Sequence, residues 1–486
     1  MDGVVSDNLK QKAITGVIWK FLEQGGTQLI QFLAGIYIAR ILSPDDYGLI
    51  GMMAIFLGIS IVFIDSGFRS TLIQKGNSVT QADYNTIFYF NLSVSVFFYI
   101  LIYWGAPSIA QFYDEPRLTI VARIIGINLI LMSLGMIHQI IFEKKINFKT
   151  ISKINLIATF ISACSGIILA VMGFGVWALV SMFLVESLIR SMLLWIINKW
   201  RPNLEFSLVS LKTLLPMGSK LLFAGILNQF SQNIFSLAIG KLFTTGDVGF
   251  YSQAKKLQQR IGDIITYSIQ GVLLPVQSLL KEDIPRLKNA VQTNVKITSL
   301  IAFPAIFGLM AVARPFIILA LTDKWLPSVY YVYILSISGF FFVLSSAIGS
   351  YLLPIGKVNF IVKIGIFSNI LLLVLIALGV LMKVDLKLLI LGKALQEFLV
   401  FIVTVYYANR FIKYRFIEVM KDIAPVTLLS LFMGAFVFYL GEIFGTSILV
   451  LGLQVFCGIG LYVIGNYIFN RKLFTEIFRY FVKQRK

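Results

Sequence analysis

Amide and ionisable side chains interrupt the first long apolar segment of the chain. Lys20, Glu23, Gln24, Gln28 and Gln31 lie mostly three or four residues apart, which places them on one face of a helix. A charge at membrane depth is costly unless it faces protein or water. The spacing therefore predicts that this face lines a hydrated cavity, where a ligand could be bound by charge and by hydrogen bonds.

Two later apolar segments carry polar residues in the same way. Lys220, Gln229 and Gln232 lie on one side of the segment at 212–241. The segment at 248–276 is the most polar of all, and its polar residues follow a helical period. We predict that the three stripes line one substrate-binding cavity. Its predicted lining residues are Lys20, Glu23, Gln28, Gln31, Lys220, Gln229, Gln232, Lys255, Lys256, Arg260 and Asp263.

The predicted cavity contains more basic than acidic residues, and this balance indicates an anionic substrate. Lysine and arginine at a lipid–water boundary suit phosphate or pyrophosphate. Glutamine suits hydroxyl-rich ligands such as sugars, because it forms hydrogen bonds without charge. The combination favours a glycan attached to a lipid phosphate. For any single residue, an ion pair that only fixes helix packing is the alternative.

Other polar residues in apolar segments are open to structural roles. Glu186 and Arg190 are four residues apart and opposite in charge. Lys393 and Glu397 have the same spacing, so we expect both pairs to form internal ion pairs. For His138, the single histidine, a hydrogen-bonded packing role is favoured over a proton relay. Two further candidates for the cavity are Asp65 and Arg123.

The composition of the whole chain indicates a membrane environment for these residues. Hydrophobic residues make up 58% of the 486 residues and charged residues only 13%, whereas soluble domains contain roughly 25% charged residues. The net charge of +19 does not indicate nucleic-acid binding, because the basic residues are scattered between apolar runs. Cys164 and Cys457 lie in apolar runs and suggest neither a disulfide nor a metal site.

Apolar segments long enough to cross a bilayer number about fourteen, which predicts an all-α membrane protein with that number of transmembrane helices. Lysine and arginine concentrate in every second connection and near both ends of the chain, as in the connection with Lys144, Lys145 and Lys149. Since basic residues accumulate on the cytoplasmic side of membrane proteins, we predict that both termini are cytoplasmic. The connections are too short to hold a catalytic domain outside the membrane.

The first pair of segments resembles a later pair, which indicates an internal repeat. Gln28 and Gln31 correspond to Gln229 and Gln232 at one fixed offset, and the turns that follow are Ser-Pro-Asp-Asp and Thr-Thr-Gly-Asp. Turns alike by chance are the alternative, but chance does not explain the matched glutamines. Copies separated by six segments run parallel, an arrangement typical of transporters. The predicted gate residues at the two turns are Arg40, Asp46, Lys241 and Asp247.

The repeat predicts two lobes of six helices each around a central cavity. We expect the N-terminal lobe at 1–205 and the C-terminal lobe at 206–415. Residues 416–486 would form two additional helices and a basic cytoplasmic tail. Equivalent helices of the two lobes carry the polar stripes, as expected for a cavity at the repeat interface.

Short motifs along the chain carry a family resemblance. They are residues 14–56, DSGFRSTLIQK at 65–75, GFGVWALV at 173–180 and TTGDVGFYSQAKKLQQ at 244–259. These stretches resemble Wzx-type polysaccharide flippases of the multidrug/oligosaccharidyl-lipid/polysaccharide (MOP) exporter superfamily, and among them the colanic-acid-type branch. The resemblance implies a fourteen-helix fold, similar to multidrug exporters of that superfamily, whose two lobes open alternately to either side of the membrane.

The resemblance also implies a function. Such a flippase moves undecaprenyl-pyrophosphate-linked oligosaccharide repeat units across the bacterial inner membrane, for lipopolysaccharide O-antigen, capsule or exopolysaccharide synthesis. It is a multi-pass transporter and not an enzyme. The expected partners are the lipid-linked oligosaccharide, membrane lipid, and a polysaccharide polymerase with its chain-length regulator. We expect no cofactor and no nucleic acid.

Two other functions are weighed against this one. A drug or cation antiporter of the same superfamily would need more acidic residues in the cavity. A membrane glycosyltransferase or O-antigen ligase would need a long outer loop with catalytic residues. The sequence contains no nucleotide-binding loop, so ATP is not expected to drive transport directly.

Overall fold

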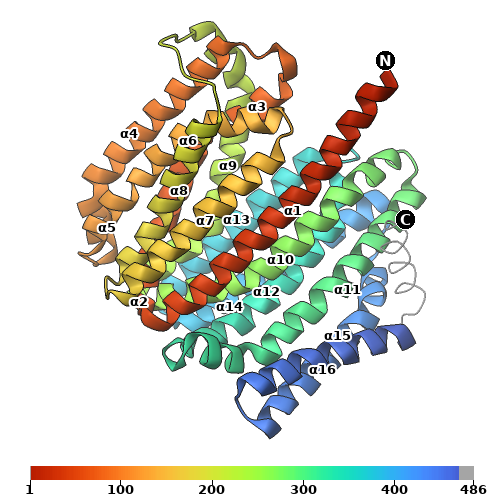
Figure 1. The fold of residues 1–486 in the computed structure, drawn as a ribbon. Helices are drawn as coiled ribbons and strands as arrows, with labels where there is room; N and C mark the ends of the chain where they lie inside the picture. The colour runs from red at the N-terminus through yellow and green to blue at the C-terminus, as the bar shows by residue number, and fades with distance from the viewer. Residues whose placement is uncertain (1, 470–486) are drawn as a thin grey trace. The chain divides into compact units, whose positions relative to one another are not determined.

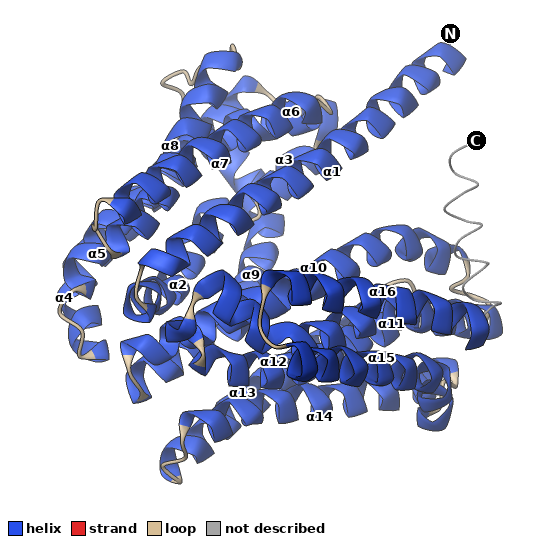
Figure 2. Cartoon of the chain, turned by 60° about the horizontal axis from the view of Figure 1, so that its bottom comes forward, coloured by secondary structure: helices blue, strands red, loops and turns tan. Residues whose placement is uncertain are grey.

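A computed structural model describes residues 2–469 of the chain and shows helices joined by short turns, with no strand in that range (Figures 1 and 2). Side chains are described for residues 15–468, apart from 17, 77, 217, 220 and 260–276. The chain forms two compact units, Met1–Gly249 and Phe250–Lys486. The division into 1–205, 206–415 and 416–486 remains a prediction.

The first unit contains nine helices of the described chain and the beginning of a tenth. They are α1 (Asp2–Ile41), α2 (Pro44–Asp65), α3 (Phe68–Gln74), α4 (Gln81–Tyr113), α5 (Leu118–Ile125), α6 (Ile127–Lys144), α7 (Phe148–Val171), α8 (Val176–Ile197) and α9 (Leu208–Leu242), with a short 3₁₀ turn at Gly76–Ser78. Within this unit, α7 packs between α1 and α8, while α9 packs along α2.

The second unit is built from α10 (Thr245–Leu279), whose first residues belong to the first unit, and from the helices that follow. These are α11 (Ile284–Phe316), α12 (Pro327–Gly349), α13 (Val358–Leu381), α14 (Leu386–Ile412), α15 (Phe416–Phe444) and α16 (Ile448–Phe469), with short turns of helix at Ile317–Leu321, Asp323–Trp325 and Ser350–Leu352. Its core lies where α11 meets α12 and α15 and where α12 meets α14, around Phe303 and Phe401.

Eleven helical segments of the described chain are long and apolar enough to cross a membrane. A twelfth is obtained if α9 is one span, since it bends by 58° between Leu208–Pro216 and Leu221–Leu242. The predicted all-α, multi-pass membrane fold is confirmed, but the number fourteen is not established. The difference lies in α1 and α10, which are not among these segments and whose side chains are described only in part.

Candidate functional site

The turn between α1 and α2 holds the predicted gate residue Asp46 in a helix cap. Its Oδ2 atom accepts hydrogen bonds from the Ser43 backbone N–H at 3.0 Å and from the Ser43 hydroxyl at 2.7 Å. The Ser43 hydroxyl in turn accepts from the Asp46 N–H. This reciprocal arrangement is a capping box, and it satisfies backbone groups that the start of a helix leaves unpaired.

The turn between α9 and α10 repeats this cap. Asp247 Oδ2 accepts from the Thr244 N–H at 3.2 Å and from the Thr244 hydroxyl at 2.8 Å, and the Asp247 N–H donates to the same hydroxyl at 3.2 Å. The two aspartates that we predicted for a gate therefore have the same local role. Each starts a helix, and the matched pattern follows the proposed sequence repeat.

The two turns also contact each other in a reciprocal way. A Cβ atom on Gly48 would lie 1.9 Å from the carbonyl oxygen of Thr245, and a Cβ on Gly249 would lie 1.9 Å from that of Pro44. Gly48 corresponds to Gly249 in the repeat, as Pro44 corresponds to Thr245. Only glycine allows backbones to approach this closely. We call this contact the glycine clasp.

Charged residues surround the glycine clasp on its exposed side. Lys241 pairs with Asp114 at 3.2 Å, and Arg40 is exposed. Glu115 accepts a hydrogen bond of 3.0 Å from the Thr245 hydroxyl and forms a two-point contact with Arg117 at 2.8 and 2.7 Å. The Arg117 guanidinium lowers the pKa of the Glu115 carboxyl. The carboxylates near the clasp are thus compensated.

Among the predicted cavity residues, Glu23 has a structural position between α1 and α7. It is 7% exposed and accepts hydrogen bonds from Lys20 at 2.9 Å, Ser152 at 2.8 Å and Asn155 at 2.8 Å. A buried carboxylate with three donors has each of its oxygens hydrogen-bonded. Glu23 therefore links α1 to α7. Its ion pair with Lys20 also holds the half-exposed lysine side chain in place.

Two lysines that were not predicted as cavity residues, Lys149 and Lys153, form a basic cluster near Lys20. The ammonium groups of Lys149 and Lys153 lie 5.7 and 5.9 Å from the ring centre of Trp19, both within cation–π range. Together with Lys20 they form what we call the α1–α7 basic cluster. In the sequence, the spacing of four residues between Lys149 and Lys153 at the start of a span could have indicated that both lie on one face of the helix.

The predicted glutamines differ in their surroundings. Gln229 of α9 lies against α2, where a Cβ on Gly58 would be 2.6 Å from its Oε1, and it accepts a hydrogen bond of 3.0 Å from Asn233. Gln232 is exposed, whereas Gln28 and Gln31 are half-buried. Gln229 is therefore a packing residue as well as a candidate ligand.

In the second unit, the described cavity candidates are Lys255, which is half-buried, and Lys256, which is exposed. The charge of Lys393 acts on Lys255. Lys393 forms the predicted ion pair with Glu397 at 2.7 Å and also donates to Gln396 at 2.6 Å. The side chains of Lys220, Arg260 and Asp263 lie outside the described residues.

Two of the remaining sequence predictions concern α6 and α8. The Glu186–Arg190 ion pair is present at 2.6 Å. His138 is fully buried, with ring-centre distances of 4.7 Å to Trp195 and 5.2 Å to Trp200. Neither ring nitrogen has a hydrogen-bond partner among the described residues, so His138 is a packing residue held by aromatic contacts rather than by hydrogen bonds. Arg123 stacks on Tyr103 at 4.6 Å.

The sequence profile of a family described as polysaccharide biosynthesis protein matches residues 37–330. The chain belongs to this family. Proteins similar to this chain include the teichuronic acid biosynthesis protein TuaB of Bacillus subtilis strain 168, 24% identical over 361 residues that cover 72% of this chain and 73% of TuaB. The lipopolysaccharide biosynthesis protein WzxC of Escherichia coli strain K12 is 23% identical over 385 residues, 76% of each chain.

Solved structures show that the fold of this polysaccharide biosynthesis protein is shared with membrane transporters. The lipid II flippase MurJ in an inward closed conformation matches with a TM-score of 0.75 at 17% identity, over 95% of this chain and 99% of MurJ. An inward-facing multidrug resistance MATE transporter of the MOP superfamily matches with a TM-score of 0.64 at 14% identity, over 80% and 94%. The fold expected from the sequence motifs, similar to multidrug exporters of the MOP superfamily, is confirmed.

Proposed function

We propose that this polysaccharide biosynthesis protein is a flippase for lipid-linked oligosaccharides. It would carry undecaprenyl-pyrophosphate-linked repeat units across the bacterial inner membrane, with both termini in the cytoplasm, and it would perform no covalent chemistry. A polymerase and a chain-length regulator would act on the product on the other side. Family membership and the shared transporter fold support this proposal.

The α1–α7 basic cluster is the observation that carries the substrate assignment. Lys149 and Lys153 are exposed at the start of α7, and Lys20 is half-exposed on α1 beside them. With a cytoplasmic N-terminus, this end of α7 faces the cytoplasm. Three ammonium groups at the edge of a membrane suit a pyrophosphate head group, and the exposed glutamine Gln232 suits sugar hydroxyls.

Transport would proceed by alternating access. The glycine clasp would close the outer side while the head group binds from the cytoplasm. Lys20, Lys220, Lys255, Lys256 and Arg260 would attract the diphosphate, and the prenyl chain would remain in lipid. Separation of the two turns would then expose the head group on the outer side, with Arg40 and Lys241 at the rim.

The test is flipping of a fluorescent undecaprenyl-pyrophosphate oligosaccharide by purified protein in proteoliposomes. Wild type should move the lipid between leaflets, and Lys149→Ala with Lys153→Ala should slow flipping at least tenfold. Lys281→Ala, a lysine of the second unit on the same predicted side, is the control. Normal flipping by the double variant would refute the substrate assignment. Transport of organic cations without lipid flipping would favour the alternative, a multidrug antiporter.

A further inference from the structure

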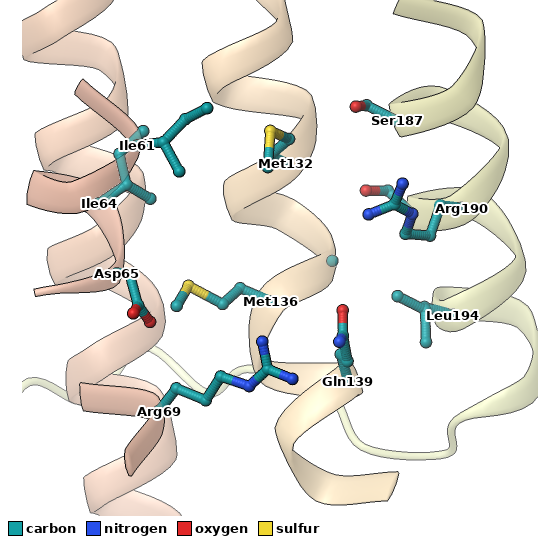
Figure 3. Close-up of a pocket in the computed structure, with 12 residues that line it drawn as sticks. Ile61, Ile64, Asp65, Arg69, Met132, Met136, Gln139, Ser187, Arg190 and Leu194 are labelled. Carbon is teal, nitrogen blue, oxygen red and sulfur yellow. The ribbon is translucent and has the colours of Figure 1, made fainter. Parts of the chain in front are cut away.

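A cavity of about 270 Å³ lies inside the first unit, apart from the residues assigned to the substrate (Figure 3). It is formed between α2 with α3 on one side, α6 in the middle and α8 on the other. Its polar lining includes Asp65, Arg69, Gln139, Ser187 and Arg190. The labelled side chains of Figure 3 show Asp65 and Arg69 extending from α2 and α3 toward Met136 and Gln139.

Arg69 is already engaged at the mouth of this cavity. Its guanidinium makes a two-point contact with Glu143, in which Nε donates to Oε2 at 2.9 Å and the second nitrogen to Oε1. Gln139 donates to the same carboxylate at 3.0 Å. Arg69 therefore uses its two-point hydrogen-bonding geometry, the strongest that an arginine forms with a carboxylate, to bind Glu143.

The Asp65 carboxylate has no equivalent two-point contact among the described residues, and the donor recorded for it is the backbone N–H of Arg69. Its Oδ1 atom is buried and has no hydrogen-bond partner among the described residues. Asp65 is also the last residue of α2, where the negative end of the helix dipole disfavours a carboxylate. A buried polar atom without a partner is costly, and more so when it is charged.

The charges that face Asp65 do not balance. Arg69 and Glu143 act on it from α3 and α6. On α8, Arg190 is paired with Glu186 at 2.6 Å. The described lining contains no charged residue from α4 or α9, and the side chain of Lys220 on α9 lies outside the described residues. Three carboxylates therefore face two guanidinium groups, which leaves one negative charge to be neutralised.

A proton suits this site better than a metal ion. Hard cations require several oxygen ligands, and no group of three or more acidic, histidine or cysteine residues that could hold a metal occurs in the described chain. The guanidinium groups of Arg69 and Arg190 would also repel a metal ion. A proton on Asp65 needs no further ligands and removes the excess charge.

The backbone next to Asp65 connects the carboxylate to the bend of α9. Ser66 and Gly67 both have left-handed conformations, with φ of 44° and 69°. A Cβ on Gly218 would lie 2.6 Å from the Ser66 carbonyl oxygen, and a Cβ on Gly67 would lie 2.7 Å from the Leu221 Cβ. The bend of 58° in α9 falls between Pro216 and Leu221, at this contact.

We propose that Asp65 binds a proton in one transport state, and that this protonation is coupled to the bend of α9. The role of Asp65 as a coupling site rests on the proposed transport function. The protonation of Asp65 and its effect on α9 do not depend on that function. The coupling ion is thus a proton, and its binding residue lies in the first unit. Release of the proton restores the uncompensated charge and favours a different arrangement of Ser66, Gly67 and α9.

Hydrogen–deuterium exchange of the full-length protein between pH 5.5 and 8.5, corrected for the intrinsic pH effect, tests the coupling. Protection of the segment 208–225 should change with pH in wild type. In Asp65→Asn, which carries no titrating group, protection should stay constant at its low-pH level. Asp65→Glu should keep a pH response. Glu205→Gln should keep it too, and is the control because it also replaces a carboxylate by a carboxamide, but at an exposed position. A pH response that persists unchanged in Asp65→Asn would overturn the proposal, as would a response to sodium instead of pH.

Flipping in proteoliposomes with an imposed pH gradient separates this proposal from the proposed function. We expect the gradient to change the flipping rate of wild type but not that of Asp65→Asn. Flipping that ignores the gradient in wild type would overturn the role of Asp65 as the coupling site and leave the flippase assignment intact. Absence of flipping, with exchange that still depends on pH through Asp65, would reject the flippase assignment and support the proton site.

Discussion

The two ends of α2 carry an aspartate in opposite environments. Asp46 lies in the first turn, where the helix dipole favours a carboxylate and Ser43 donates two hydrogen bonds. Asp65 lies at the last residue, where the dipole disfavours the charge and Oδ1 has no partner in the described structure. The comparison shows that an aspartate caps the helix at its N-terminus and leaves an unbalanced charge at its C-terminus.

Backbone packing differs between the two ends as well. At the first end, Gly48 and Gly249 bring two helices into backbone contact through regular helical residues. At the second end, Ser66 and Gly67 break the helix with left-handed conformations and contact a bent part of α9. The first arrangement is the tighter of the two in this structure, because backbone meets backbone, whereas the second adjoins the bend of α9.

The largest effect is expected from Gly48→Ala at the first end. The new methyl group would overlap the Thr245 carbonyl oxygen, which belongs to the backbone and cannot rotate away. We expect a loss of about 3 kcal/mol in unfolding free energy, measured as a lowered Tm in detergent. Gly35→Ala on α1 is the matched control, because no atom lies within 4 Å of its Cβ position. Equal Tm values would show that the clasp is not tightly packed.

Gly67→Ala tests the second end and should be milder. A left-handed residue with a Cβ costs roughly 1–2 kcal/mol. The α9 backbone also has to shift, because the Leu221 Cβ lies 2.7 Å and the Gly218 carbonyl oxygen 3.0 Å from the added atom, but these contacts are less close than the 1.9 Å at Gly48. We expect a smaller fall in Tm than for Gly48→Ala, together with altered exchange in α9. A larger fall at Gly67 than at Gly48 would show that the second contact is the tighter one.

The aspartates themselves give the next comparison. Asp46→Ala removes the carboxylate half of the capping box, which accepts from Ser43, and should lower stability by about 0.5–1.5 kcal/mol. Asp65→Ala removes an uncompensated charge, so stability near neutral pH should be unchanged or higher. Chemical unfolding of both variants in detergent measures the difference. Loss of stability at Asp65 as large as at Asp46 would mean that Asp65 has a stabilising partner.

The smallest effect is expected when the pH is lowered and the Glu115–Arg117 pair near the glycine clasp is lost. Arg117 lowers the pKa of Glu115 in the folded protein, so this pair stabilises the fold above the unfolded pKa of the carboxyl. The stabilisation is lost as pH falls through the lowered folded pKa. Because Arg117 is 54% exposed, the effect should be below about 1 kcal/mol. Tm measured between pH 3 and 7 should fall slightly less steeply for Arg117→Ala than for wild type.

The sequence was most informative where a feature is local or repeated. Hydropathy identified the helices, and the offset between Asp46 and Asp247 identified turns that share one cap. The ion pairs of Glu186 and Lys393 followed from helical spacing alone. Each of these features depends on residues within one turn of helix, which a linear pattern records.

Contacts between distant helices could not be read in this way. Helical periodicity placed Glu23 on a polar face, but only the fold shows that Ser152 and Asn155 of α7 occupy it. The same limit hid the pairing of Arg69 with Glu143, and therefore the isolation of Asp65. A polar residue at membrane depth can bind substrate or hold two helices together. The sequence does not distinguish these roles, since both require a buried position and a hydrogen-bonding partner.

The reciprocal form of the glycine clasp has an evolutionary consequence. A contact in which each turn offers the same surface to the other is the kind that two identical chains form across a two-fold axis. A half-length ancestor with one such turn could associate with its own copy through this contact. Gene duplication and fusion would then preserve the contact within one chain, with the glycine of each copy retained by the backbone of the other.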